Sequence, residues 1–233
     1  MADEIRVTSR RERHKDLRRT QIVDAAYDLL REVGADELSV KMIADRADVS
    51  AATIYNLFGA KGAVLEKVYA RDFEAFAARV AGAGEMRAID LVFESIRIAA
   101  DLYRSDPAFY RGMSLGNPRA EPDLVVSVQG PRQAFWQDLL ARAVKERDLA
   151  TETRIDLVSM AMMQLGGGAF GAWVADLISI DQMEQQTCYG LARLLLGVAR
   201  PAGREKLQAR IAAIEAAQAP VPKATPEGRR KHG

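Results

Sequence analysis

The fold is decided by residues 39–61, SVKMIADRADVSAATIYNLFGAK, which predict two short helices joined by a tight turn. The apolar residues of each segment recur at helical spacing: Val40, Ile43, Ala44 and Ala47 in the first, Ile54 and Phe58 in the second. Between them, Asp48 and Val49 supply a turn and an apolar anchor, and Ser50 can accept a backbone N–H at the start of the second helix. A pair of this kind is the helix-turn-helix, whose second helix enters the major groove of DNA.

This stretch resembles the DNA-binding domain of the TetR family of bacterial repressors. The likeness rests on an ordered set of residues within one short window: Gly34, Ser39, Val40, Ile43, Ala44, Val49, Ser50, Thr53, Ile54, Tyr55, Phe58 and Lys61. It covers residues 20–68 at the level of motif, and beyond them only the helical layout and the length match. The resemblance implies a homodimer that binds a palindromic double-stranded DNA operator, with its recognition helices about 34–36 Å apart, and leaves it when a small effector binds.

The expected fold is all-α: an N-terminal three-helix helix-turn-helix DNA-binding domain followed by a larger helical ligand-binding and dimerisation domain. We expect four segments in chain order: a basic arm over 1–19, the DNA-binding domain over 20–65, the effector-binding and dimerisation domain over 66–219, and a disordered tail over 220–233. Apolar periodicity predicts a first helix from Ile22 that is capped by Gly34, and a long helix over 61–80 that links the two domains mechanically.

The remaining helices are delimited by Pro, Gly, Asp and Ser. The predicted ranges are 86–104, 107–115, 123–147 with a break or kink at Pro131, 152–178, 181–199 and 202–218. Residues 155–177 are apolar on most faces, which predicts burial on more than one side. The resemblance pairs the last two main helices with their copies across a two-fold axis. Glycines 166–168 and 171 then predict close backbone approach or a local break.

Composition describes a soluble globular protein: 28% of the 233 residues are charged and 48% are hydrophobic. The charged N-terminus and the absence of an apolar run of roughly 18 residues favour the cytoplasm, with no membrane. The single cysteine, Cys188, excludes an intrachain disulfide. Net charge is only +1, but residues 10–20 hold six basic and two acidic side chains, a local charge of +4. This arm either adds salt-dependent DNA affinity or is a solvated tail.

The resemblance assigns roles to particular DNA-facing residues. Lys41 and Thr53 are expected at base edges with Asn56 beside them, while the phosphate contacts are expected from Ser39, Ser50, Tyr55 and Lys61. Arg18 is added as a DNA-binding residue because it belongs to the basic arm. The chain departs from the family pattern at Asp48, where the turn often has Gly, and at Ala51 and Ala52, which offer no polar group. Each role has an alternative: the serines can serve only as N-caps, Tyr55 as a core-edge aromatic, and Lys61 as solvated surface.

The larger domain carries many aromatic and sulfur-containing side chains, which suggest a small, mainly apolar or aromatic effector. The candidate ligand-binding residues are Phe93, Tyr103, Tyr110, Met113, Trp136, Met163, Gln164, Phe170 and Trp173. Gln164 is also a candidate to orient a polar end of the ligand, as are Arg97, Arg104 and Gln133. Core packing explains most of these residues equally well.

Catalytic and metal sites are not expected. The two histidines, His14 and His232, lie in the terminal segments, and Cys188 has no local partner, so the usual nucleophile and metal constellations are missing and no cofactor is expected. The alternative that stays open is a helical DNA-binding protein without an effector, for which the larger domain would be fully packed. Repression rather than activation depends on promoter geometry.

Overall fold

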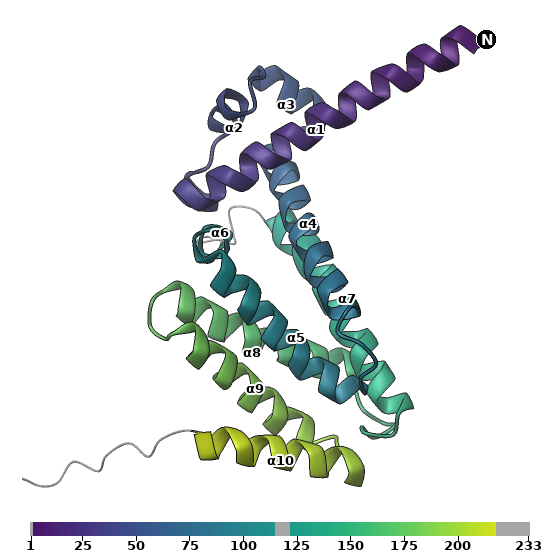
Figure 1. The fold of residues 1–233 in the computed structure, drawn as a ribbon, viewed down its shortest axis with the longest axis vertical. Helices are drawn as coiled ribbons and strands as arrows, with labels where there is room; N and C mark the ends of the chain where they lie inside the picture. Colours follow the sequence, from purple (N-terminus) through teal and green to yellow (C-terminus); the bar gives the residue numbers. More distant parts are fainter. Residues whose placement is uncertain (1, 115–121, 218–233) are drawn as a thin grey trace, which may run out of the picture.

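The computed structural model describes residues 2–114 and 122–217, and over these ranges the chain folds into ten α-helices (Figure 1). They are α1 (Ala2–Glu37), α2 (Val40–Arg46), α3 (Ala51–Phe58), α4 (Lys61–Ala81), α5 (Ala88–Ser105), α6 (Pro107–Gly112), α7 (Pro122–Lys145), α8 (Ile155–Val174), α9 (Ile180–Leu196) and α10 (Pro201–Ala217). The described residues contain no strand, only one isolated bridge between Leu149 and Ala199. The all-α prediction is confirmed. The expected tail, 220–233, lies outside the described residues.

The N-terminal head consists of α1, α2, α3 and the first turns of α4. Apolar side chains from all four helices form its core: Ile22, Ala26, Leu30, Ile43, Ile54, Val64 and Leu65, each fully buried. Gly34 interrupts α1 with φ 74° and ψ 171°, a backbone conformation that glycine adopts without a steric penalty. Because of this kink, the chain turns back and places α2 and α3 against α1 (Figure 1).

Helix α1 is longer than the sequence pattern predicts. The amphipathic spacing begins at Ile22, but the helix begins at Ala2 and takes in the basic arm. Residues 2–33 contain no Pro or Gly and are rich in Arg, Glu and Leu, which favour helix even where no apolar face has to be buried. The arm therefore continues the helix axis away from the head (Figure 1).

The larger domain packs α4, α5 and α7 together with α8 and α9, and α10 covers the end of α9 (Figure 1). Most boundaries lie within three residues of the predicted ones. Helix α7 runs continuously through Pro131, so of the predicted break or kink the break is absent. Helix α8 ends four residues earlier than expected, because Asp176 adopts a left-handed conformation with φ 57°.

Helix α8 leaves much of its apolar surface exposed. It is the one helix in the described ranges that is long and apolar enough to cross a membrane, a test that core helices also pass, and 22% of it is buried. Leu157, Met160, Gln164, Gly168 and Gly171 form an exposed stripe along it. A Cβ added at any of its four glycines would meet nothing within 4 Å, so the glycines cause neither a break nor a close approach within one chain.

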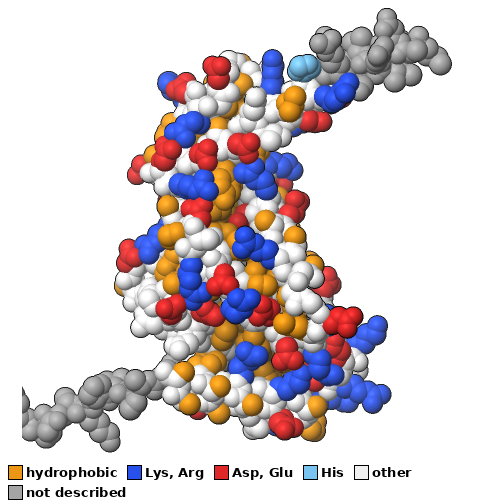
Figure 2. All heavy atoms as spheres, viewed as in Figure 1, with side chains coloured by type: hydrophobic (Ala, Val, Ile, Leu, Met, Phe, Trp, Pro, Cys, Tyr) orange, Lys and Arg blue, Asp and Glu red, His pale blue; other side chains and the backbone are white. Residues whose placement is uncertain are grey.

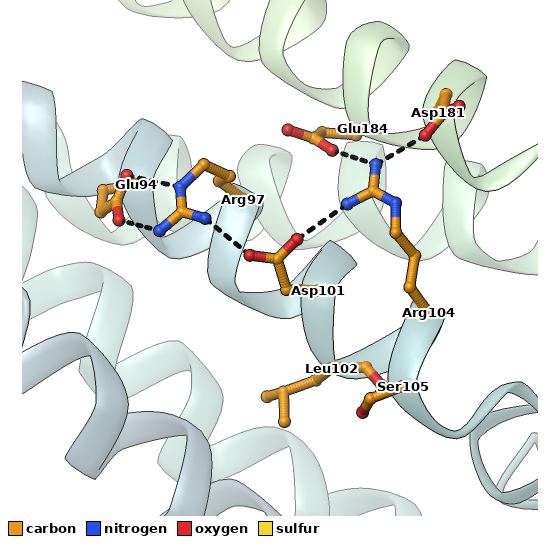
Figure 3. Close-up of polar contacts among 8 residues, drawn as sticks. All are labelled: Glu94, Arg97, Asp101, Leu102, Arg104, Ser105, Asp181 and Glu184. Atoms are coloured by element: carbon orange, nitrogen blue, oxygen red, sulfur yellow. Dashed lines mark hydrogen bonds and ion pairs between the residues drawn. The ribbon is translucent and has the colours of Figure 1, made fainter.

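Charges of both signs alternate over the surface seen in Figure 2. On the outside of α5 they form a continuous chain of ion pairs that reaches α9 (Figure 3). Arg97 pairs with Glu94 at 2.5 Å and with Asp101 at 2.6 Å. Arg104 continues the chain with pairs to Asp101 at 3.0 Å, Asp181 at 2.7 Å and Glu184 at 2.6 Å. Arg104 joins α5 to α9, whereas Arg97 pairs only within α5. Neither arginine lines the internal cavity, so the expectation that they orient a ligand is not supported.

Candidate DNA-binding surface and internal cavity

Two serine caps and a left-handed turn shape the helix-turn-helix. The Ser39 hydroxyl accepts the Met42 N–H at 3.2 Å, and the Ser50 hydroxyl accepts the Thr53 N–H at the same distance. Asp48 has φ 51°, the conformation for which the turn often uses glycine. The predicted caps are therefore present, and Asp48 makes the turn. The hydroxyl of Thr53 lies 2.9 Å from that of Ser50, so the candidate base contact is partly held by the cap.

Helix α3 presents one face to solvent. Its buried side is Ile54, with Leu57 and Phe58 half-buried beside it. Its outer side carries Ala51, Ala52, Tyr55 and Asn56. Tyr55 is 54% exposed, so the alternative that it is a core-edge aromatic is wrong. A face of two small residues flanked by a hydroxyl and an amide can approach a duplex closely and donate hydrogen bonds.

The lysines of the head differ in their surroundings. Lys41 on α2 is exposed and pairs with Asp45 at 2.6 Å. Lys61 is half-buried at the start of α4, where its ammonium donates to the Ala35 carbonyl at 3.2 Å, so its alternative as free solvated surface is wrong. Arg18 is exposed on α1. Lys41 and Arg18 are therefore available to nucleic acid, whereas Lys61 also fixes the geometry of the head.

A cavity of about 400 Å³ lies inside the larger domain, between α4, α5, α6, α7, α8 and α9. Its aromatic lining is Tyr69, Phe73, Phe76, Tyr103, Tyr110, Phe135, Trp136 and Phe170. Several of these rings contact one another edge to face; for example, Phe76 and Phe135 have centroids 5.3 Å apart and Tyr103 and Phe170 5.2 Å apart. The volume falls in the range of small-molecule sites, roughly 300–1,000 Å³.

Six of the nine candidate ligand-binding residues line this cavity: Tyr103, Tyr110, Met113, Trp136, Met163 and Phe170. The other three lie elsewhere. Phe93 is buried under the guanidinium of Arg210, which is 4.1 Å from its ring centre. Trp173 stacks behind Tyr103 with centroids 5.6 Å apart, and Gln164 is exposed on the outer stripe of α8. Sequence reasoning misplaced these residues because it identified apolar helices but not which side of each helix faces the cavity. Gln133 is also absent from the lining.

Two charged residues of the lining were missed by the sequence analysis, Asp72 on α4 and Arg132 on α7. The Tyr110 hydroxyl donates to Asp72 Oδ1 at 2.8 Å. Burial raises the pKa of the Asp72 carboxyl, although the Tyr110 hydrogen bond and the charge of Arg132 lower it. An acid between Tyr69 and Phe76 on the apolar stripe of α4 was the signal that could have identified this position.

Helix α6 touches both the cavity and the head. Tyr110 and Met113 line the cavity, while Phe109 stacks on Tyr27 of α1 with ring centroids 3.9 Å apart. Asp106, which caps α6, pairs with Arg31 of α1 at 2.6 Å. The α6–α1 contact is the most extensive between any two helices described. A change in the cavity wall at α6 therefore reaches α1 directly.

Comparison with known proteins identifies a family similarity in the head. Residues 22–68 match the profile of bacterial regulatory proteins of the tetR family. Over 44 residues, 19% of this chain, the sequence is 54% identical to the uncharacterized HTH-type transcriptional regulator YdeS of Bacillus subtilis (strain 168). That match spans about a fifth of the relative's length, 22%.

Solved structures extend the likeness to the whole fold. TylP, a TetR regulator from Streptomyces fradiae, is 20% identical with a TM-score of 0.61, covering 86% of this chain and 97% of TylP. RolR, solved in complex with resorcinol, is 19% identical with a TM-score of 0.59, covering 85% of this chain and 95% of RolR. At these identities the likeness concerns the arrangement of helices.

Proposed function

The chain belongs to the TetR family of bacterial transcriptional regulators, and from this premise we propose that it is a homodimeric repressor released from a palindromic DNA operator by a small, mainly apolar aromatic effector. The observation that carries the proposal is the arrangement of three parts: an exposed recognition helix, an aromatic cavity, and α6 in contact with both. The family regulates transcription and is not enzymatic.

On the DNA side, α3 enters the major groove. Tyr55 and Asn56 are exposed on its outer face, and Lys41 on α2 is equally accessible. Lys41 reads base edges once DNA displaces its partner Asp45, whereas Tyr55 and Arg18 bind phosphate. The serine caps also leave the first N–H groups of α2 and α3 near the DNA, where they favour an anion.

On the effector side, the cavity argues against the alternative of a DNA-binding protein without a ligand, because that alternative requires a fully packed larger domain. RolR, which has the same arrangement of helices, was solved in complex with resorcinol, a small aromatic ligand. Effector and DNA are coupled if the effector binds more tightly to the form whose recognition helices are wrongly spaced. Helices α4 and α6, which supply cavity residues and reach the head, transmit the change.

The dimer uses the exposed stripe of α8 together with α9. Exposed Leu157 and Met160 lie on the same face as Gly168 and Gly171, where a second backbone can approach closely. Pairing two such faces removes apolar surface from water and accounts for glycines that have no role within one chain.

Selection of bound sequences from a random duplex library, with a nonspecific competitor and at two salt concentrations, tests the proposal. A palindrome with two half-sites about one helical turn apart is the expected result. Enrichment of no sequence, with retention that falls steeply as salt rises, would mean nonspecific binding. No retention at all would contradict the assignment of α3 as a recognition helix.

A further inference from the structure

The cavity contains a pair of opposite charges that do not neutralise each other directly. Asp72 comes from α4 and Arg132 from α7, and both line the cavity among aromatic side chains. Among the described residues, no ion pair within 4 Å joins Asp72 to a basic side chain, and the nearby Arg71 pairs with Asp24 on the head instead. The two charges therefore face the same enclosed space at different points of its wall.

Only one of the two carboxylate oxygens of Asp72 accepts a hydrogen bond from the described residues. In the part of the chain that the structure describes, the Tyr110 hydroxyl donates to Oδ1, and no protein group donates to Oδ2. Oδ2 is not among the buried side-chain atoms that lack a partner, so it remains accessible in a residue that lines the cavity, and its acceptor lone pairs are available to a ligand. A ligand with a hydrogen-bond donor can therefore bind to Asp72 Oδ2, to which no described protein group donates.

Arg132 retains donors for a ligand. One of its N–H groups, on Nη1, donates to the Val128 carbonyl at 3.0 Å, and its guanidinium lies 5.5 Å from the centre of the Phe73 ring. A guanidinium has five N–H donors in a fixed plane, so several remain. The cavity thus offers one acceptor and one donor of opposite charge within an aromatic wall.

We propose that the effector is a neutral aromatic compound bearing a hydroxyl group, which donates to Asp72 and accepts from Arg132 while its ring packs against Phe73, Phe76 and Phe135. This inference rests on the proposed function, since it names the ligand of the same cavity. A hydroxyl has both a donor and two acceptor lone pairs, so it satisfies both residues at once. A hydrogen bond is stronger beside apolar aromatic walls than in bulk water, which favours both contacts.

Charged ligands fit the same wall less well. A cation would pair with Asp72 but would be repelled by Arg132, and an anion would be repelled by Asp72. Either would also bury a net charge, whereas Asp72 and Arg132 together add none. An aromatic hydrocarbon would leave Asp72 Oδ2 without a donor. The hydroxyl compound is therefore expected to bind most tightly.

Four compounds with one naphthalene ring system test these alternatives: 2-naphthol, 2-methoxynaphthalene, 2-naphthoate and 2-naphthylmethylammonium. Isothermal titration calorimetry on the full chain without DNA measures each affinity. A hydrogen bond to a charged group predicts that 2-naphthol binds about tenfold to a hundredfold more tightly than its methyl ether. Both charged compounds are expected to bind more weakly than 2-naphthol.

Variants assign the preference to Asp72 and Arg132. In Asp72→Ala, the affinity for 2-naphthol should fall to about that for 2-methoxynaphthalene, while the affinity for the ether stays the same. Asp72→Asn keeps an acceptor oxygen, so its preference for 2-naphthol over the ether should be intermediate. Arg132→Gln should lower the affinity for 2-naphthol and raise the affinity for 2-naphthylmethylammonium. Glu74→Gln is the matched control, because Glu74 is exposed on the same helix and faces away from the cavity lining.

Equal affinity for the naphthol and its ether, tighter binding of either ion, or no binding of any of the four at millimolar concentration would overturn the inference. Failure of the proposed function has a different signature, because DNA retention is measured separately on the same preparations. A chain that retains an operator but ignores the hydroxyl group disproves only the ligand class. A chain that prefers 2-naphthol but retains no DNA disproves the regulator.

Discussion

The DNA-binding head and the cavity domain differ in how far apart in sequence their determining contacts lie. In the head, Ser50 caps α3 through Thr53 and Asp48 makes the turn two residues earlier, so each feature is local. In the cavity domain, Asp72 and Arg132 line the same cavity only because α4 packs beside α7. The family profile likewise matches residues 22–68, which cover the head and the start of α4, and not the rest of the cavity domain. Local contacts define a reusable head, whereas long-range packing defines an individual cavity.

The junction of the two regions should be the most sensitive point of the molecule. A Cβ added to Gly112 of α6 would lie 1.8 Å from the Leu30 carbonyl oxygen of α1, and the atom in the way is backbone. Gly112→Ala should therefore lower the free energy of unfolding by about 3 kcal/mol, measured by urea denaturation. Gly130→Ala on α7 is the control, because a Cβ there meets nothing within 4 Å. Equal losses from both variants would mean that α6 does not join the regions by close packing.

The second prediction concerns the exposed stripe of α8, where a Cβ added at Gly168 would contact neither the head nor the cavity domain of the same chain. Replacing Gly168 by Leu adds bulk where nothing lies within 4 Å in one chain, so the folded monomer should be almost unaffected. If a second copy packs there, dimer affinity should fall by about 2 kcal/mol, or roughly thirtyfold. Sedimentation velocity over a concentration series measures this, with Glu74→Gln as a surface control. An unchanged dimer would place the interface elsewhere.

Removing a local contact in the head should have a smaller effect. Ser50→Ala deletes the N-cap of α3 and should cost about 1 kcal/mol of stability, whereas Ser50→Asn keeps a capping oxygen and should cost much less. Thermal unfolding monitored by circular dichroism distinguishes them. Because the cap is local, the affinity for 2-naphthol should stay the same in both variants. A loss of naphthol affinity in Ser50→Ala would show that the two regions are more strongly coupled than their contacts indicate.

Tyr55 and Lys41 of the head should contact different parts of the DNA, Tyr55 the phosphates and Lys41 the bases. Tyr55→Phe removes one phosphate donor and should weaken binding to all duplexes about fivefold, while Lys41→Ala should relax preference at particular base pairs by a similar factor. Affinities for operator variants at two salt concentrations separate the two outcomes. Lys61→Ala is a poor probe of phosphate binding, because the Lys61 ammonium also donates to Ala35. Identical behaviour of Tyr55→Phe and Lys41→Ala across the variants would remove Lys41 as a base reader.

The same contrast explains how much could be predicted from the sequence. The caps Ser39 and Ser50 and the turn at Asp48 follow from signals that lie within a few residues, and all three are present. Gly34 is predicted to cap the first helix; it has a positive φ but forms a kink, and α1 continues beyond it to Glu37. Helix boundaries in the larger domain follow from Pro, Gly and Asp, although Pro131 shows that tertiary packing can carry a helix through a proline.

The cavity was only half predictable, because helical periodicity says that a residue is apolar but not which neighbour it faces. Phe93 and Phe170 both lie in helices with many apolar residues, yet Phe93 lies under Arg210 and Phe170 lines the cavity. Asp72 was visible as an acid on an apolar stripe. Its opposing charge at Arg132 could be found only once α4 and α7 were placed side by side.

The smallest effect is expected from a substitution at Asp72, which tests whether this cavity residue lowers the stability of the ligand-free protein. Burial raises the pKa of Asp72 above its unfolded value, so the ionised carboxylate is less favourable in the fold than in the unfolded chain. Tyr110, Arg132 and Arg71 act against this shift but do not cancel it. Asp72→Asn should therefore stabilise the ligand-free protein, by about 0.5 kcal/mol at neutral pH.

The stability difference between Asp72→Asn and the wild type should depend on pH. As the pH falls through the raised pKa, the folded protein takes up a proton before the unfolded chain does, so the penalty disappears and the advantage of Asp72→Asn should shrink. Urea denaturation from neutral pH down to the ordinary range of a carboxyl group measures this, with Glu74→Gln as the control that should show no such trend. A variant that is less stable than the wild type at neutral pH would mean that Asp72 holds α4 and α6 together through Tyr110. In that case the carboxylate would be structural, and the cavity domain would depend on its polar contacts as much as the head depends on its caps.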